Sequence, residues 1–241
     1  MSKGVVYIAT GEKYISEAIF SATQLKKIMP SVHVTIFSDQ YFSSPAVDSL
    51  VKINDPQFGF IDKVKYIKES PYDKTLFLDT DTYVVDELTE LFKLLDTFEI
   101  AAPYAPIDDV VEGVPKSFQE MNTGVILFRN TSKVKKCFLD WLIFHQRECE
   151  ISIEEPPDQL SFREAVYKNK LHHHLLAHEY NCMISFPVLL HGRVSIFHGR
   201  NISIELLAEK INEYSDYYRI FHPVIGIIFE RDGVNLIEHL N

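Results

Sequence analysis

The chain has 241 residues, of which 46% are hydrophobic and 24% charged, so it can bury a sizeable core as one large domain or two small ones. Its 24 basic residues face 34 acidic ones, and the resulting net charge of −10 repels phosphate backbones, which excludes nucleic acid as an expected partner. No segment approaches the roughly 18 consecutive apolar residues that a membrane span needs, so we expect no transmembrane segment.

The N-terminus and the cysteines favour a cytoplasmic location. The chain enters a strand-like run at Val5 without the long apolar region of a signal peptide. Cys137, Cys149 and Cys182 are scattered, odd in number and without metal spacing, which is typical of packed thiols in a reducing compartment.

The first third of the chain alternates strand and helix patterns. Apolar runs predict strands at residues 5–9, 32–37 and 50–53, and apolar residues at helical spacing predict helices over residues 15–29 and 61–67. A strand, a helix and a second strand in this order form a βαβ unit, in which the two strands pair in parallel.

The pattern continues beyond residue 74 and predicts an α/β sandwich. The long segment at residues 104–120 contains several turn residues and is expected to be a functional loop. The further expected strands cover residues 74–78, 99–103, 124–128 and 196–198, and the expected helices cover residues 88–95, 132–148 and 157–168. Residues 204–214 are amphipathic and residues 224–229 form a short apolar run, and neither segment is assigned to an element.

Two carboxylates, Asp79 and Asp81, follow the apolar run 76–78. Side chains alternate along a strand, so both aspartates point the same way if the strand continues through them. Two like charges that lie close together are costly unless a cation lies between them, and this favours Mg²⁺ or Mn²⁺ with open positions for phosphate oxygens. With Asp86 as a helix N-cap, the pair would lie at a strand-to-helix junction, where open α/β sheets bind ligands. The alternative is a solvated turn.

Four sequence blocks resemble, in the same order, motifs of GT-A-fold glycosyltransferases, and of family 8 (glycogenin-like and galactosyltransferase) members in particular. They are Ile8 to Tyr14, the Asp-x-Asp block Leu76 to Asp81, the block Met121 to Phe128 with its Asn-Thr-Gly-Val, and Pro157-Asp158-Gln159. The resemblance spans residues 5–200. It implies a GT-A (Rossmann-like) α/β/α sandwich with a mixed, mainly parallel sheet over residues 1–216, and a short C-terminal appendage at residues 217–241.

The resemblance implies a UDP-sugar as the donor and places its nucleotide at the first strand-to-helix turn, formed by Ala9, Thr10 and Tyr14. An aromatic ring one turn into a helix can stack on a uracil-like base while the Thr10 hydroxyl hydrogen-bonds that base. Asp39 closes the second strand as a ribose-binding acid would, and an N-cap or turn role is equally compatible.

Two lysines on the helix before the acidic strand are candidates for the donor phosphates. Lys63 and Lys65 flank Val64, so one can reach the phosphates while the other stays in solvent, and the resemblance favours Lys63. Thr80, which lies between the two aspartates, is also expected to bind the donor.

Asn122, Asp158 and Gln159 are the expected catalytic residues, which contact the transferred sugar. Asn122 offers an amide beside Gly124, which lets backbone come close, and a turn at the start of a strand is its structural alternative. Asp158 begins a helix, where N-capping alone would explain it, and Gln159 adds a second polar group.

His198 and Arg200 end a strand-like run and would complete the site. His198 would join Asp79 and Asp81 as a nitrogen ligand, which favours Mn²⁺, and Arg200 would neutralise the leaving diphosphate. His191-Gly192-Arg193 repeats the tripeptide and makes His191 a competitor. The tract His172 to His174 is expected in solvent or at a strand edge. The longer His-x-x-Gly-x-x-Lys-Pro-Trp block of the family is absent.

The expected function is metal-dependent transfer of a sugar from a nucleotide diphosphate donor to a hydroxyl on a glycan, a lipid-linked sugar, a protein or a small molecule. Retention, which the family resemblance implies, needs no strong base; inversion would need a carboxylate such as Asp108, Asp109 or Asp158. A haloacid dehalogenase-like phosphohydrolase, with Asp79 as nucleophile, and a non-catalytic nucleotide-sugar binding module are the rival hypotheses.

Overall fold

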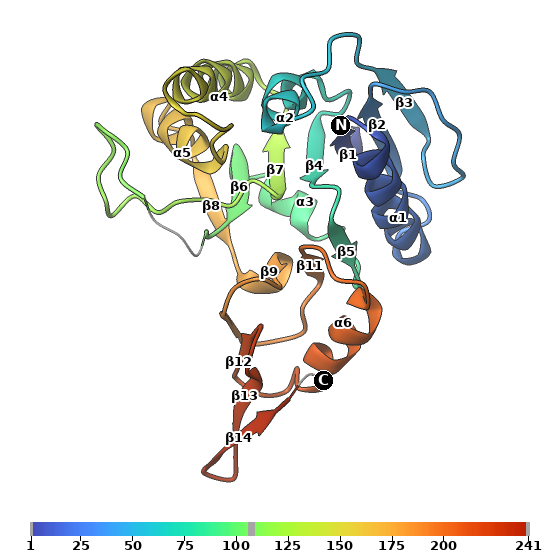
Figure 1. Ribbon diagram of the computed structural model, residues 1–241, viewed down its shortest axis with the longest axis vertical. Coiled ribbons are helices and arrows are strands. Elements are labelled where there is room, and N and C mark those ends of the chain that lie inside the picture. Colours follow the sequence, from blue (N-terminus) through green and yellow to red (C-terminus); the bar gives the residue numbers. More distant parts are fainter. Residues whose placement is uncertain (1, 106–108, 240–241) are drawn as a thin grey trace.

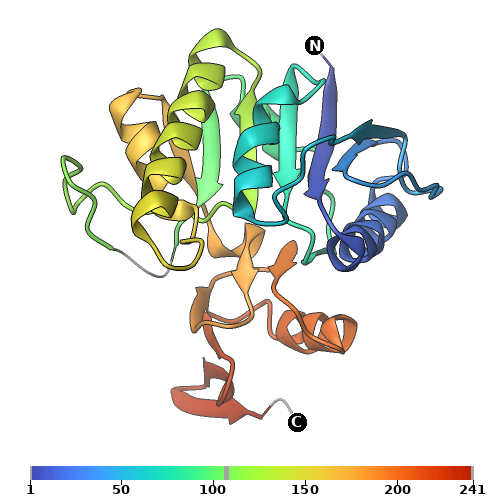
Figure 2. The ribbon, with the colours of Figure 1, turned by 45° about the horizontal axis from the view of Figure 1, so that its top comes forward.

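The structure, a computed structural model, describes residues 2–105 and 109–239 and consists of a large α/β body with a smaller β-rich lobe below it (Figures 1 and 2). In chain order its elements are β1 (Lys3–Ala9), α1 (Glu12–Ile28), β2 (His33–Ser38), β3 (Ser49–Lys52), α2 (Phe60–Tyr66), the 3-10 helix η1 (Ile67–Glu69), β4 (Lys74–Leu78), β5 (Thr82–Val84), α3 (Leu91–Leu94), β6 (Ile100–Pro103), β7 (Val125–Arg129), α4 (Ser132–Ile151), α5 (Gln159–Lys168), β8 (His173–Leu176), the 3-10 helix η2 (His178–Tyr180), β9 (Cys182–Met183), β10 (Val188–Leu190), β11 (Ile196–His198), α6 (Ile204–Glu213), β12 (Arg219–His222), β13 (Gly226–Arg231) and β14 (Val234–Glu238).

The body is built on a seven-stranded sheet with the order β3-β2-β1-β4-β7-β6-β8. Only β7 among these strands runs antiparallel to its neighbours β4 and β6; the other adjacent pairs are parallel. The predicted α/β sandwich with a mixed, mainly parallel sheet is therefore confirmed. Because β1 and β4 are parallel neighbours, the residues that follow their carboxyl ends lie side by side.

Strand alternation divides the core between the two faces of the sheet. Val6 and Phe77 point to one face and pack with the apolar sides of α2, α4 and α5, where Trp141 and Phe162 are fully buried. Val5 and Leu76, their sequence neighbours, point to the other face, against α1 and α3. Helices cover the faces of the sheet, and the carboxyl ends of the parallel strands point toward the lobe, as Figure 2 shows.

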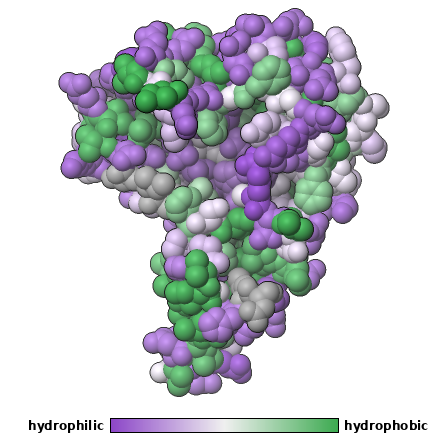
Figure 3. All heavy atoms as spheres, in the orientation of Figure 1, coloured by the Kyte–Doolittle hydropathy of each residue, from purple (hydrophilic) through white to green (hydrophobic). Residues whose placement is uncertain are grey.

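The lobe has its own apolar core, which contains Phe197, Ile211, Phe221 and Phe229. One small sheet has the order β5-β11-β9, and a second has the order β10-β12-β13-β14. On the second sheet a row of aliphatic side chains faces outward, and Figure 3 shows hydrophobic atoms gathered on this part of the surface. The row consists of Leu189, Ile220, Ile228 and Ile237, which lie opposite one another in the strand register.

The segment after the acidic pair differs from the prediction. Asp79 and Asp81 lie between two strands, β4 and β5, and not at a strand-to-helix junction. Residues 82–84 extend because they pair antiparallel with β11. Asp86 is not a helix N-cap: α3 begins at Leu91, with Glu90 at the cap position. Residues 82–84 thus form a strand that pairs with the lobe.

Within residues 2–105 and 109–239, none of the helices has the length and apolarity that crossing a membrane would require.

Candidate active site

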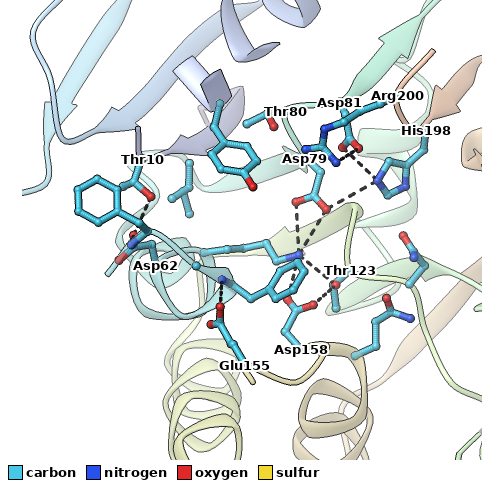
Figure 4. Close-up of a pocket in the computed structure, with 18 of the residues that line it drawn as sticks. Thr10, Asp62, Asp79, Thr80, Asp81, Thr123, Glu155, Asp158, His198 and Arg200 are labelled. Carbon is cyan, nitrogen blue, oxygen red and sulfur yellow. Dashed lines mark hydrogen bonds and ion pairs between the residues drawn. The ribbon is translucent and has the colours of Figure 1, made fainter. Parts of the chain in front are cut away.

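A pocket of about 370 Å³ opens where β1 and β4 end, between the body and the lobe (Figure 4). Its volume lies in the range of small-molecule sites. It is lined by Ile8, Thr10, Tyr14, Phe58, Gly59, Phe60, Asp62, Lys63, Asp79, Thr80, Asp81, Asn122, Thr123, Glu155, Asp158, Gln159, Met183, His198 and Arg200. Most of the residues predicted from the sequence therefore meet in one place, although they come from elements far apart in the chain.

Asp79, Asp81 and His198 form a group that could hold a metal ion, with one ligand atom from each within 4.8 Å of the others. Nε2 of His198 lies 3.3 Å from Oδ1 of Asp81 and 3.8 Å from Oδ2 of Asp79. The aspartates converge through a turn, because β4 ends at Leu78 and Thr82 N donates to the Asp79 carbonyl at 3.3 Å. Strand alternation is therefore not what brings the two carboxylates together.

The surroundings shift the pKa values of these groups in different directions. Burial raises the pKa of Asp79, an effect that the positive charge of Lys63 opposes. Burial would also raise the pKa of Asp81, but hydrogen bonding from His198 and the charge of Arg200 lower it to about 2. Burial lowers the pKa of His198, and the two carboxylates outweigh that effect and raise it. The two carboxylates thus favour a positive charge beside them, as a cation site requires.

Two asparagines hold the His198 ring. Its Nδ1 donates to Oδ1 of Asn181 at 2.9 Å, and Nδ2 of Asn181 donates to Oδ1 of Asn122 at 3.2 Å. Gly124 is needed beside the ring, because a Cβ at this position would lie 2.1 Å from Cε1 of His198. Asn181 was not predicted from the sequence, since it lies in an irregular segment without a motif.

Lys63 is buried at the floor of the pocket. Its Nζ lies 2.9 Å from Oδ2 of Asp158 and 3.3 Å from Oδ1 of Asp79, and it donates to Oγ1 of Thr123 at 3.1 Å. Burial lowers the pKa of Lys63, but Asp158 and Asp79 more than compensate and raise it to about 12. Lys65 is the lysine that lies outside the pocket, with its Nζ 3.4 Å from Asp55.

Asp158 precedes α5, as predicted, but its side chain does not cap the helix. Oδ2 faces Lys63, and Oδ1 accepts from Thr123 Oγ1 at 2.9 Å. Capping therefore does not explain Asp158. Both of its oxygens are engaged in the buried network of Figure 4.

Arg200 reaches over the pocket from the end of β11. Its guanidinium lies 3.1 Å from Oδ2 of Asp81 and makes two hydrogen bonds of 2.8 and 2.9 Å to Glu17, which also accepts from Thr80 Oγ1 at 3.0 Å. The guanidinium carbon lies 5.5 Å from the centre of the Tyr14 ring. Glu17 was missed by sequence reasoning, although it lies one helical turn after Tyr14 and so on the same side of α1.

The first strand-to-helix turn contributes only part of the predicted set. Tyr14 is 39% exposed, so its ring is available for stacking, whereas Thr10 is buried and donates to Oδ2 of Asp62 at 2.7 Å. Ala9 is fully buried and does not line the pocket. Asp39 also lies outside the lining and accepts from Gly11 N at 2.8 Å, which is its turn alternative.

Asn122 and Gln159 both line the pocket. The Oδ1 of Asn122 accepts from Gly124 N at 2.9 Å, as expected for the turn alternative, and its Nδ2 lies 3.5 Å from Met183 Sδ. Nε2 of Gln159 lies 3.4 Å from Oε1 of Glu120. Asp109 is exposed and does not line the pocket, and Asp108 lies outside the described residues.

The other histidines lie elsewhere. His191 is exposed and its ring packs 5.0 Å from that of Tyr218 in the lobe. The tract of His172 to His174 runs into β8, the edge strand of the large sheet, in agreement with the expected strand-edge role. Phe98 packs against two of these rings.

Comparison with known proteins gives structural matches but no sequence match: no protein-family model and no curated protein matches the chain. The glycosyltransferase GlyE of Streptococcus pneumoniae TIGR4 is 22% identical with a TM-score of 0.57 over 76% of this chain, and its apo form is 20% identical with a TM-score of 0.59 over 84%. The galactosyltransferase LgtC, solved with donor and acceptor sugar analogs, is 14% identical with a TM-score of 0.56 over 83% of this chain and 88% of its own.

These similarities show the fold. The chain has a mixed α/β fold with a large, mostly parallel sheet, like that of GT-A glycosyltransferases. It matches only 47% and 55% of the two GlyE chains, so it spans about half of their length.

Proposed function

We propose that the protein is a metal-dependent glycosyltransferase that moves a sugar from a nucleotide diphosphate donor, most simply a UDP-sugar, to an acceptor hydroxyl. The observation that carries the proposal is the group of Asp79, Asp81 and His198 in the same pocket as Lys63 and Arg200. A diphosphate needs cations around it, and this pocket offers two fixed ones beside a site for a third.

The donor set suits Mn²⁺, and Mg²⁺ less well, because two carboxylates are combined with an imidazole nitrogen. When bound, the ion would offset phosphate charge and stabilise the leaving nucleoside diphosphate. The chain contributes the preorganisation: Asn181 fixes the His198 ring, and Lys63 opposes the effect of burial on the pKa of Asp79 and holds this carboxylate in place.

The exposed ring of Tyr14 is the expected stacking surface for the base, at the rim of the pocket beside Thr10. Arg200 lies between this ring and Asp81, so its guanidinium can face a diphosphate that runs from base to metal. Donor binding would then draw Arg200 from Glu17 toward the phosphates.

Transfer with retention is the stereochemistry we favour. Asp158 lines the pocket, but both of its oxygens are engaged by Lys63 and Thr123, so it is poorly placed as a general base. Asn122 and Gln159 are then the sugar-contacting groups, as the family 8 resemblance implies. The acceptor is a glycan, a lipid-linked sugar, a protein or a small molecule.

We also expect a cytoplasmic location and no nucleic acid partner. All three cysteines are free thiols, which suits a reducing compartment, and the net charge is −10.

The test is a screen of nucleotide sugars by thermal stabilisation and by release of UDP, with Mn²⁺ and with EDTA. A donor at 100 times its dissociation constant should add about 2.7 kcal/mol to the stability. We expect stabilisation by at least one UDP-sugar, together with slow Mn²⁺-dependent hydrolysis when no acceptor is present. Failure of every nucleotide sugar to bind would exclude both the enzyme and the non-catalytic binding module.

A further inference from the structure

A second group of metal-binding side chains lies beside the start of α2. His145 and Cys149 occupy one face of α4, four residues apart, and Glu155 folds back toward them after the helix ends. One ligand atom from each residue lies within 4.8 Å of the others. The proposed transfer reaction uses none of these three side chains.

His145 is the centre of this group. Its ring is fully buried, with Nε2 3.4 Å from Oε1 of Glu155. Nδ1 faces the other way, 3.4 Å from Oγ of Ser161 and 4.0 Å from Oε2 of Glu148. Metal-binding histidines are commonly held in this way, because a hydroxyl or carboxylate at one nitrogen orients the other toward the ion.

Cys149 differs from the other two cysteines in its exposure to solvent. Cys137 and Cys182 are buried in apolar cores, as the sequence suggested, whereas Cys149 is only partly buried and an ion can reach it from solvent. The spacing of the cysteines alone does not indicate a metal site. The pattern becomes visible only when the fold adds a histidine on the same helix face and a glutamate from the following loop.

We propose that His145, Cys149 and Glu155 bind a zinc ion, with the fourth position open to water. One nitrogen, one sulfur and one oxygen ligand suit tetrahedral zinc, whose bonds of about 2.0–2.3 Å need the side chains to close in by about 1 Å. The Cys149 thiol loses its proton to solvent as the Zn–S bond forms. A thiolate ligand selects against Mg²⁺ and Mn²⁺, so the two metal sites of the protein differ in preference.

The zinc ion would act on the pocket through Glu155. This carboxylate accepts from the backbone N–H of Phe60 at 2.9 Å and of Ile61 at 2.7 Å, and Figure 4 shows it pointing toward this turn. It fits there because residue 59 is a glycine, where a Cβ would lie 2.0 Å from Oε2 of Glu155. Phe58, Gly59 and Phe60 line the pocket. Drawing Glu155 toward zinc loosens this wall, so we expect zinc to weaken donor binding, a step that rests on the proposed function.

The test of the site is a titration of the full chain with Co²⁺, a spectroscopic substitute for zinc. Only the second group contains sulfur, so a thiolate-to-cobalt charge-transfer band reports on it and not on Asp79, Asp81 and His198. We expect one such cobalt ion per chain, displaced by Zn²⁺. Cys149→Ser should abolish the band and weaken zinc binding at least tenfold, whereas Cys137→Ala, on the same helix, should leave both unchanged.

Absence of the band from the wild-type chain, or its persistence in Cys149→Ser, would overturn the zinc site. The coupling is tested by UDP affinity in Mn²⁺ with and without Zn²⁺, with Cys149→Ser as the control for zinc at the other site. If Zn²⁺ lowers the UDP affinity of the wild type and not that of Cys149→Ser, the coupling is supported. If the wild type binds UDP equally well with and without Zn²⁺, the coupling is overturned. If UDP binds under no condition, the proposed function fails while the cobalt result still decides the zinc site.

Discussion

Oδ1 of Asn181 lies 2.9 Å from Nδ1 of His198, on the edge of the ring that faces away from Asp79 and Asp81. The orientation of the amide is fixed because its Nδ2 donates to Asn122. The Asn181 oxygen therefore accepts a hydrogen bond from Nδ1–H, which leaves Nε2 to face the carboxylates. The asparagine thus sets the tautomer that a metal ligand requires.

We therefore predict that Asn181→Ala weakens Mn²⁺ binding by about 10–100-fold, the usual effect of removing such a partner. Asn181→Asp, which keeps an acceptor, should retain most of the affinity. Isothermal calorimetry with Mn²⁺ measures both. His198→Ala should lose more than either, and His191→Ala should match the wild type. A larger loss in His191→Ala than in His198→Ala would reassign the ligand to His191.

Gly124 provides a second test of the same contact. In Gly124→Ala the new Cβ would meet the His198 ring at 2.1 Å, so the ring must move away from the carboxylates. We expect a loss of about 1–3 kcal/mol in the free energy of unfolding, as for other overpacked sites, and weaker Mn²⁺ binding. Gly192→Ala is the matched control, because nothing lies within 4 Å of its Cβ position. Wild-type metal affinity in Gly124→Ala would contradict the assignment of His198.

The large sheet was predictable because its strands and the helices between them carry strong local patterns. Strands were predicted at residues 5–9, 32–37 and 74–78, and the structure has β1, β2 and β4 at these places. The short strand β5 was not recognised, since residues 82–84 extend only because β11, more than 100 residues later, pairs with them. Local sequence cannot specify such a partner, and Asp86 was mistaken for a helix cap as a result.

The residues of the candidate site are likewise of two kinds: those that local sequence marks and those that only the fold brings together. Asp79, after a strand end, and Asp158, before a helix, were predicted because motifs mark them. Glu155 lines the pocket, whereas Glu17 and Asn181 hold residues that line it, and in each case only the fold brings the side chain there. Ala9 and Asp39 show the converse, because a position next to a binding turn does not by itself bring a side chain into the pocket.

Replacing Asp81 by Ala should abolish transfer and leave the fold intact. Asp81 lies in a turn at the pocket and not in the apolar core, and Arg200 keeps its two hydrogen bonds to Glu17 in the variant. We expect at least about a 100-fold loss in kcat, on the scale of other lost electrostatic contacts in active sites. UDP affinity in Mn²⁺ should fall to the value that the wild type shows in EDTA. A near wild-type rate, or equal wild-type UDP affinity in the two conditions, would contradict the metal assignment.

Glu148 should make stability depend on pH near neutrality. Burial raises its pKa to about 7, although Arg147 opposes the effect. The neutral carboxyl is thus favoured in the folded state, and this contribution is present below the unfolded pKa of about 4.5 and lost as the pH rises through about 7. In Glu148→Gln this loss of stability should be absent. We expect the free energy of unfolding of the variant to exceed that of the wild type by about 1–2 kcal/mol at pH 8, after allowance for solvent screening, and to differ little from it at pH 4.5. Parallel stability curves for the two proteins from urea unfolding would contradict this.

The reaction class can be decided at Asp79. In a haloacid dehalogenase-like phosphohydrolase this carboxylate would attack phosphorus and form an aspartyl phosphate. In the structure its oxygens face Lys63 and His198, an arrangement suited to holding a cation and not to freeing a nucleophile. We therefore expect beryllium fluoride, which mimics a phosphoryl group on aspartate, to leave Asp79 unmodified in ¹⁹F NMR, while UDP is released slowly from at least one UDP-sugar. An adduct on Asp79 that disappears in Asp79→Asn, with phosphatase activity and no UDP release, would establish the phosphohydrolase and reject the transferase.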